Sequence, residues 1–184
     1  RPILLSMFSP SGAESVADFR VLEVIPAFII TVGGTFSGIF LPKSAEMVVR
    51  KDQAAISSFA YGWTKRTTIL ANILCVPFVL SAGEALSAYV GAHYAVLSPW
   101  LILWLLTVLV QIHTTPGNSL LLAYGKTTPL LLTSGAACVV SMLINIVLAA
   151  RYGAGAAVVG YFVYVIIVIG LYYVAYYKKL MRLS

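Results

Sequence analysis

The sequence predicts an all-α protein, a polytopic bundle of about five transmembrane helices plus the stump of a sixth. Two observations predict this fold class. Hydrophobic residues make up 60% and charged residues 10% of the 184 residues, against about 45–50% and about 25% in soluble domains. The few charges also cluster at the ends of long uncharged windows. A soluble fold of this length could not bury so much apolar surface.

Uncharged windows locate the helices, because about 20 residues cross the hydrocarbon core of a bilayer. The apolar stretch Pro2–Phe8 is too short to span, and we expect it to close a truncated helix of a longer protein. The third span starts near Ser98, because the stretch before it carries the Gly, His, Ser and Pro of a turn. The expected spans cover about residues 18–42, 67–83, 98–124, 127–150 and 153–177.

Residues 43–65 form the most charged part of the chain, yet Val48, Ile56, Phe59 and Trp63 recur at near-helical spacing. A helix lying in the headgroup region of the cytoplasmic leaflet, with its apolar face toward the lipid, explains both properties. A solvated loop is the alternative interpretation. We expect the interfacial helix over residues 43–65.

Cations orient the bundle, because the cytoplasmic loops of membrane proteins carry an excess of Lys and Arg. If the spans alternate, one side receives Arg1, Arg20 and Arg151. The other receives Lys43, Arg50, Lys51, Lys65, Arg66, Lys126, Lys178, Lys179 and Arg182. The larger set marks the cytoplasm, so the C-terminus is expected there. Lys126 then lies in a tight cytoplasmic turn, with Gly125 at the end of one helix and Pro129 in the first turn of the next.

Polar residues at membrane depth are costly and tend to mark transport pathways. Arg20 and Glu23 share a helix face near the outer end of the first span. They either form a structural salt bridge, or Arg20 faces an aqueous cavity and grips an anionic substrate group such as pyrophosphate. Gln111, His113 and Asn118 lie in QIHTTPGNS, the most polar interior of any span. They either line a cavity or bond neighbouring helices.

Catalytic and cofactor patterns are missing from the sequence. It contains no H-E-x-x-H, no phosphate-binding glycine loop and no Cys cluster, so no catalytic residue, metal or other cofactor is expected. The net charge of +6 does not indicate a nucleic-acid partner, because the cations sit at the ends of apolar runs. Asn145, a lone amide in an apolar helix, is expected to bond a neighbouring helix.

Four stretches follow one another in a familiar order and spacing. They are SPSGAESVADFRVLEVIPAFIITVGGTFSGIFLPKSAEM, SAGEALSAYVGAHYAVLSPWLILWLL, LLAYGKTTPLLL and INIVLAARYGAGAAVVGYFVY. The first resembles an external loop, a helix and an L-P-x turn. The second resembles a helix exit and an amphipathic piece whose G-x-x-Y, here Gly91 to Tyr94, leads into the next span. The third resembles a small-residue-plus-lysine turn, and the last an Asn-bearing helix that leads into a Gly/Ala-rich final span.

These stretches resemble the lipid-linked oligosaccharide flippases, the O-antigen and exopolysaccharide exporters. These flippases and exporters belong to the superfamily that includes multidrug and toxin extrusion transporters. The resemblance implies about twelve to fourteen helices in two pseudo-symmetric bundles around a cavity. This chain would hold the C-terminal five helices and a stump, and the missing N-terminal bundle would be its partner. The family's cavity cations are not fixed in sequence position, so Arg20 enters as a hypothesis.

The function that the resemblance implies is export by alternating access, without catalysis. The cargo would be a polyprenyl pyrophosphate-linked oligosaccharide for cell-surface polysaccharide, and the protein would lie among the lipids of the bacterial inner membrane. One alternative is a multidrug antiporter of the same superfamily, in which Glu23 would couple transport to an ion. The others are a membrane-bound polymerase or acyltransferase, and a polysaccharide-biosynthesis protein or scaffold without transport activity.

Overall fold

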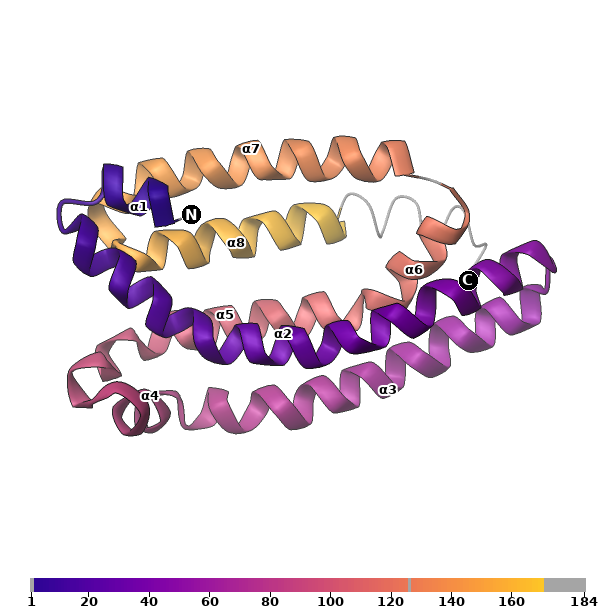
Figure 1. Cartoon of the computed structure of the whole chain (residues 1–184), viewed down its shortest axis with the longest axis horizontal. Helices are drawn as coiled ribbons and strands as arrows, with labels where there is room; N and C mark the ends of the chain where they lie inside the picture. The colour runs from indigo at the N-terminus through magenta and orange to yellow at the C-terminus, as the bar shows by residue number, and fades with distance from the viewer. Residues whose placement is uncertain (1, 126, 171–184) are drawn as a thin grey trace.

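The computed structural model describes residues 2–125 and 127–170, and all regular structure in them is helical. The α-helical class is therefore confirmed for this part of the chain. Most helices run along the long axis of the molecule, as Figure 1 shows. In chain order they are α1 (Pro2–Phe8), α2 (Gly12–Val49), α3 (Gln53–Leu80), α4 (Ala82–Val90), the 3₁₀ helix η1 (Ala92–Leu97), α5 (Ser98–His113), α6 (Thr115–Ala123), α7 (Thr127–Tyr152) and α8 (Ala154–Ile167).

Three helical segments are long and apolar enough to cross a membrane, namely α2, Ala92–His113 and Leu130–Tyr152. A fourth is present if α3 and α4, which bend by 76° relative to each other, form one broken span. The expected fifth span, residues 153–177, is described only as the shorter apolar helix Ala154–Gly170, and its remainder lies outside the described residues. The structure thus supports three to four spanning helices and does not confirm five.

Large apolar side chains are exposed on the outer helices. Leu131 and Val147 of α7 are 73% and 74% exposed, and Phe28 of α2 is 62% exposed. Soluble proteins rarely leave extended apolar surface in contact with water. A surface of this kind is typical of a protein that lipid surrounds.

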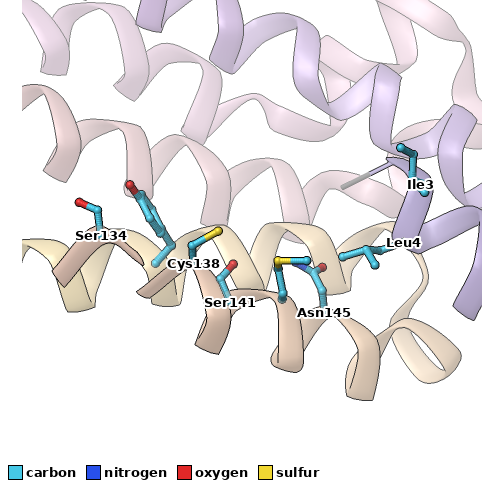
Figure 2. Close-up of a pocket in the computed structure, with 8 residues that line it drawn as sticks. Ile3, Leu4, Ser134, Cys138, Ser141 and Asn145 are labelled. Carbon is cyan, nitrogen blue, oxygen red and sulfur yellow. The ribbon is translucent and has the colours of Figure 1, made fainter. Parts of the chain in front are cut away.

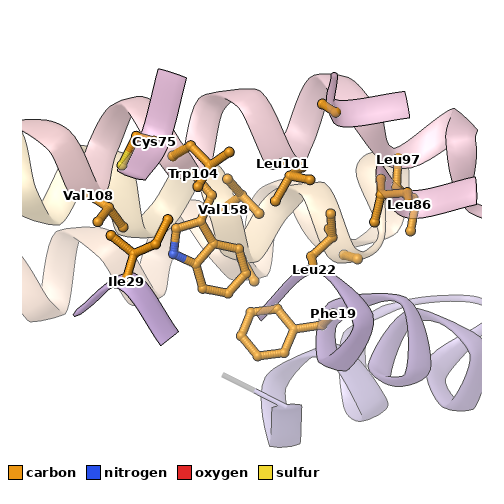
Figure 3. Packing of buried hydrophobic residues seen from close by; sticks show 14 of the residues in the cluster. Phe19, Leu22, Ile29, Cys75, Leu86, Leu97, Leu101, Trp104, Val108 and Val158 are labelled. Carbon is orange, nitrogen blue, oxygen red and sulfur yellow. The ribbon is translucent and has the colours of Figure 1, made fainter. Parts of the chain in front are cut away.

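The main core forms around α5, which contacts α2, α3 and α8. Figure 3 shows side chains of these helices meeting around Trp104. The Trp104 ring lies 5.2 Å from Phe19 of α2 and 6.1 Å from Tyr161 of α8, measured between ring centroids. Leu101 and Val108 complete the same face of α5 and are fully buried. Aromatic burial therefore joins three helices that are distant in sequence.

Turns gather at two opposite ends of the molecule (Figure 1). One end holds the α1–α2 turn, α4 and the α7–α8 turn, and the other holds the α2–α3 hairpin and the α6–α7 connection. At the first end Gly153, with a φ of +50°, is the single residue between α7 and α8. A Cβ at Gly153 would lie 2.9 Å from the Ser15 Oγ, which itself lies 2.7 Å from the Ser9 Oγ. Glycine is needed here for both the backbone conformation and the close approach.

The described cations divide between these two ends. Arg20 near the start of α2 and Arg151 near the end of α7 lie toward the first end. Toward the hairpin end lie Lys43, Arg50, Lys51, Lys65 and Arg66. Lys126 lies outside the described residues, but Gly125 before it has a φ of +70° and its N–H bonds the Leu122 carbonyl oxygen at 2.9 Å. This geometry matches the expected helix end at Gly125.

The structure does not contain the single helix that the sequence led us to expect over residues 43–65. α2 continues to Val49, the chain turns over residues 50–52, and α3 follows at once. The turn is fixed locally, since the Asp52 carboxylate caps α3 by accepting a hydrogen bond from the Ala55 N–H at 2.9 Å. Residues 43–65 therefore belong to the tip of a helical hairpin.

The apolar residues of this segment take part in a core cluster inside the hairpin. Ile56 and Phe59 are buried together with Phe40 and Met47 of α2 and with Leu120 of α6. The rings of Phe40 and Phe59 meet edge to face, with their centroids 5.7 Å apart. The near-helical spacing thus marks a buried stripe whose partner is an antiparallel helix.

The expected third span, residues 98–124, is interrupted. α5 begins at Ser98, as expected, but the α-helix breaks at Thr114 before α6 starts. Pro116 has no backbone N–H to donate, so a carbonyl group in the preceding turn loses its helical partner. The Thr114 hydroxyl donates to the Gln111 carbonyl oxygen at 2.9 Å. The Thr114 N–H also donates to the Gln111 carbonyl oxygen, at 3.3 Å, so local hydrogen bonds close the end of α5.

Candidate functional site

Two polar residues at the end of α5 point to different neighbouring helices. The side-chain carbonyl oxygen of Gln111 accepts a hydrogen bond from the Tyr161 hydroxyl of α8. The His113 Nδ1 lies 2.6 Å from the Thr68 Oγ1 of α3. The structure therefore does not bring Gln111 and His113 into one cavity. Instead they connect α5 to helices on two sides, directly before the break at Thr114.

Asn118, the third polar residue expected in this region, lies in the first turns of α6. Its backbone N–H bonds the Thr114 carbonyl oxygen at 3.0 Å across the break. Its side chain is half-buried and makes no hydrogen bond with the residues that the structure describes. A role of the Asn118 side chain in binding stays a prediction.

Arg20 and Glu23 pair with each other on α2. Their side chains approach to 2.8 Å and are 63% and 36% exposed, respectively. An exposed pair of this kind contributes about 0–1 kcal/mol to stability. The polar end of α5 lies beside a different part of α2. Its Ile112 faces Gly33, since a Cβ at Gly33 would lie 3.1 Å from the Ile112 side chain. Gly33 is about 20 Å along α2 from Arg20 at about 1.5 Å per residue, so Arg20 and Glu23 do not join His113.

His113 lines a cavity of about 490 Å³ between α3 and the end of α5. The other lining residues are Ala60, Tyr61, Thr64, Lys65, Thr68 and Ile69. Lys65 brings a positive charge to this cavity, although the sequence indicated only a topological role for it. Lys65 and Thr68 lie three residues apart and thus share a face of α3. That spacing was visible in the sequence, whereas the helix facing it was not.

The hydrogen bonds of the Thr68 hydroxyl determine which ring nitrogen of His113 carries a proton. The Thr68 Oγ1 lies 2.7 Å from the Thr64 carbonyl oxygen, which only accepts hydrogen bonds. Since a hydroxyl carries one proton, Thr68 donates it to Thr64, and the His113 Nδ1–H donates to the Thr68 Oγ1. In neutral His113 the Nε2 is then an acceptor. The cavity therefore combines an ammonium group with an imidazole acceptor.

A groove of about 540 Å³ runs along α7 beside α8 and α1. Figure 2 shows Ser134, Cys138, Ser141 and Asn145 along one face of α7, with Leu4 of α1 beyond them. The Ser141 hydroxyl donates to the Gly160 carbonyl oxygen at 2.6 Å, so Ser141 supplies the hydrogen bond between helices that the sequence led us to expect of Asn145. Asn145 is 3% exposed, and its Oδ1 has no hydrogen-bond partner among the residues that the structure describes. None of the lining residues carries a charge.

The cavity beside His113 therefore includes a positive charge, whereas the described lining of the α7 groove includes none. Within residues 2–125 and 127–170, no three His, Cys, Asp or Glu side chains gather to hold a metal ion.

Comparison of the chain with models of protein families, with curated proteins and with solved structures gives no match. The functional assignment therefore depends on the sequence pattern and on the geometry described above.

Proposed function

We propose that the protein forms part of an exporter that moves a lipid-linked oligosaccharide across the bacterial inner membrane by alternating access. The cargo is a sugar on a polyprenyl pyrophosphate carrier, and no covalent bond is made or broken. The sequence resemblance supports this proposal. The structural observation that carries it is the broken helix α5–α6, with polar side chains directly before the break.

Broken helices support transport for a physical reason. In a lipid environment a helix interruption is tolerated only where protein groups or a water-filled cavity satisfy the freed backbone. Secondary transporters place such discontinuous helices at their substrate sites. In this chain the break at Thr114 follows Gln111 and His113, and both make hydrogen bonds to other helices. The arrangement fits a helix that changes its packing during a transport cycle.

The cavity beside His113 supplies contacts for the head of such a substrate. The Lys65 ammonium group would attract the phosphate charge as a mobile point charge. The His113 Nε2 would accept a hydrogen bond from a sugar hydroxyl. This assignment moves the proposed substrate cation from Arg20, which is paired with Glu23, to Lys65.

The charge distribution supports an orientation with the α2–α3 hairpin in the cytoplasm. Of the seven described cations, three lie near the α2–α3 turn (Lys43, Arg50 and Lys51) and two lie in the half of α3 that begins at this turn (Lys65 and Arg66), in line with the excess of Lys and Arg on the cytoplasmic side of membrane proteins. In this orientation the proposed cavity receives substrate from the cytoplasmic leaflet.

A multidrug antiporter is the second candidate, because it belongs to the same superfamily. Its ion coupling would have to use a carboxylate such as Glu23. In the structure Glu23 is engaged by Arg20. If Glu23→Gln abolished drug resistance while polysaccharide export was unchanged, the antiporter would replace our proposal.

Deletion of the gene tests the proposal in cells. We expect lipid-linked oligosaccharide to build up in the cytoplasmic leaflet and surface polysaccharide to fall, with both restored by the full-length gene. Intact surface polysaccharide without any build-up would contradict the proposal.

Variants in the same strain test the assigned cavity. His113→Asn keeps an N–H near the position of Nδ1 but removes Nε2, so we expect export to fall about fivefold, the value of one hydrogen bond of about 1 kcal/mol. The matched control is the double variant Arg20→Gln with Glu23→Gln, which we expect to export normally. The reverse ranking would return the substrate site to Arg20.

A further inference from the structure

A second basic cavity lies between the two helices of the α2–α3 hairpin, on a different face of α3 from the His113 cavity. Its volume is about 300 Å³. It is lined by Lys43 and Met47 of α2 and by Ala55, Ser58, Phe59, Gly62, Trp63 and Arg66 of α3. Two cations and one hydroxyl group therefore face a hollow whose lining includes no acidic residue.

The two cations of this cavity form no salt bridge with any residue that the structure describes. Among the described residues, neither Lys43 nor Arg66 lies within 4.0 Å of a carboxylate oxygen, the distance that defines a salt bridge. Arg50, on the same hairpin, behaves differently and bonds Glu46 at 2.8 Å. The charge of the cavity is thus available to an anionic ligand.

The geometry of the hairpin directs both cations toward the cavity. Side chains on a helix tilt toward its N-terminus. Since α2 and α3 are antiparallel, Lys43 and Arg66 tilt toward each other along the hairpin axis. The Arg66 guanidinium carbon lies over the Trp63 ring, 5.1 Å from its centroid. Trp63 is held in turn by Phe40, with ring centroids 5.0 Å apart, so the aromatic cluster fixes the direction of the guanidinium.

The cavity lies at the depth of a lipid headgroup. The uncharged stretch Val24–Pro42 of α2 is about 29 Å long at about 1.5 Å per residue, close to the hydrocarbon thickness of about 30 Å. Lys43 follows this stretch directly. Ile39, one helical turn before Lys43 on the same face of α2, is 59% exposed and offers apolar surface to an acyl chain.

We propose that this cavity binds the phosphate of an anionic glycerophospholipid from the surrounding leaflet. Arg66 would hold two phosphate oxygens through its guanidinium fork, Lys43 would add a second charge, and the Ser58 hydroxyl would donate to the headgroup. Basic pockets between transmembrane helices bind anionic headgroups in this manner. A glycerophospholipid fits better than free phosphate, because an acyl chain can lie along Ile39 on the same face of α2 as Lys43. The inference requires the membrane placement of the proposed function but not transport.

Native mass spectrometry of the full-length protein from nanodiscs tests the site. The nanodiscs contain phosphatidylcholine, either alone or mixed with phosphatidylglycerol, and the measured quantity is phosphatidylglycerol retained on the protein. Each basic residue near a bilayer surface contributes a factor of about five to binding. We therefore expect the double variant Lys43→Gln with Arg66→Gln to bind phosphatidylglycerol about thirtyfold more weakly than the wild type.

Three further variants distinguish a specific lipid-binding site from general electrostatic attraction between the hairpin and anionic lipid. Arg50→Gln with Lys51→Gln removes two charges from the same hairpin outside the cavity, so retention is expected to stay at the wild-type level. A Cβ at Gly62 has no atom within 4 Å, so a larger side chain can be accommodated there. Gly62→Leu therefore fills the cavity without changing its charge, and we expect this variant to lose phosphatidylglycerol retention. Lys43→Arg with Arg66→Lys keeps both charges and is expected to retain the lipid.

The outcomes decide the proposal directly. Equal loss in both charge-removing variants, or full retention in Gly62→Leu, would overturn the cavity as the binding site. Displacement of phosphatidylglycerol by equimolar inorganic phosphate would show that the site takes free phosphate. Gel filtration and circular dichroism of each variant confirm that it is folded. Because no transport is measured, failure here leaves the exporter proposal standing, and failure of the exporter leaves this one standing.

Discussion

Two glycines on α8 determine how closely this helix approaches its neighbours. A Cβ at Gly155 would overlap the Trp100 ring of α5, and a Cβ at Gly160 would overlap the Asn145 amide of α7. Small residues allow such approach in membrane bundles, where packing and hydrogen bonds replace the hydrophobic effect between helices. The Ser141 bond to the Gly160 carbonyl oxygen is possible because of this contact.

Substitution Gly155→Ala should destabilise the protein by about 1–3 kcal/mol, because the indole ring must move to admit a methyl group. The free energy of unfolding in detergent measures this effect. The matched control is Gly135→Ala on α7, where a Cβ has no atom within 4 Å and helix propensity favours Ala. If the two variants were equally stable, the contact between Gly155 and Trp100 would not exist as described.

Removal of the Tyr161 hydroxyl tests the bond between α8 and Gln111 of α5. We expect Tyr161→Phe to lower the free energy of unfolding by about 0.6 kcal/mol and at most about 1.7 kcal/mol, the range for hydrogen bonds between membrane helices. Tyr164→Phe, whose hydroxyl has no hydrogen bond with a described residue, should change it less. A double-mutant cycle of Tyr161→Phe with Gln111→Ala that showed no coupling would contradict the bond.

The helices show which parts of the fold the sequence could reveal. The start of α5 at Ser98 and the helix end at Gly125 were predicted correctly, because local turn chemistry determines both. The α2–α3 hairpin was not predicted, although Asp52 is a strong N-cap residue. Its apolar stripe fits a bilayer surface and an antiparallel helix equally well. Only the packing with Phe40 and Leu120 decides between them.

The position of the hairpin relative to the membrane gives a labelling prediction. In a background with Cys75→Ala and Cys138→Ala, we expect Lys51→Cys to react with an impermeant maleimide only in inverted vesicles. Arg151→Cys, at the opposite end of the bundle, should react only in right-side-out spheroplasts. Both positions are exposed, so lack of reaction reports sidedness. Reaction of both from the same side would contradict the two-ended arrangement.

The assembled molecule explains why the candidate site was only partly predictable. The sequence marks Gln111 and His113 as polar residues inside an expected span and leaves open whether they line a cavity or bond neighbouring helices; in the structure both make hydrogen bonds to other helices. The direction that each side chain takes depends on neighbouring helices. Gln111 therefore meets α8, His113 meets α3, and Lys65 shares the cavity of His113 without any local signal.

The same packing separates two kinds of basic site on α3. Lys65 lies beside His113 in the proposed substrate cavity, whereas Arg66 lies over Trp63 in the proposed lipid cavity. Consecutive helical residues point about 100° apart, so the two cations cannot substitute for each other. Neutralising Lys65 should therefore affect transport, and neutralising Arg66 should affect lipid binding.

Transport of lipid-linked oligosaccharide by the full-length protein in proteoliposomes tests the central claim most directly. The substrate is loaded into one leaflet, and its arrival in the other is followed by accessibility to an added glycosidase. We predict transfer by the wild-type protein and at least about fivefold slower transfer by Lys65→Gln, which loses one charge contact with the phosphate. Transfer no faster than in protein-free liposomes would contradict the account.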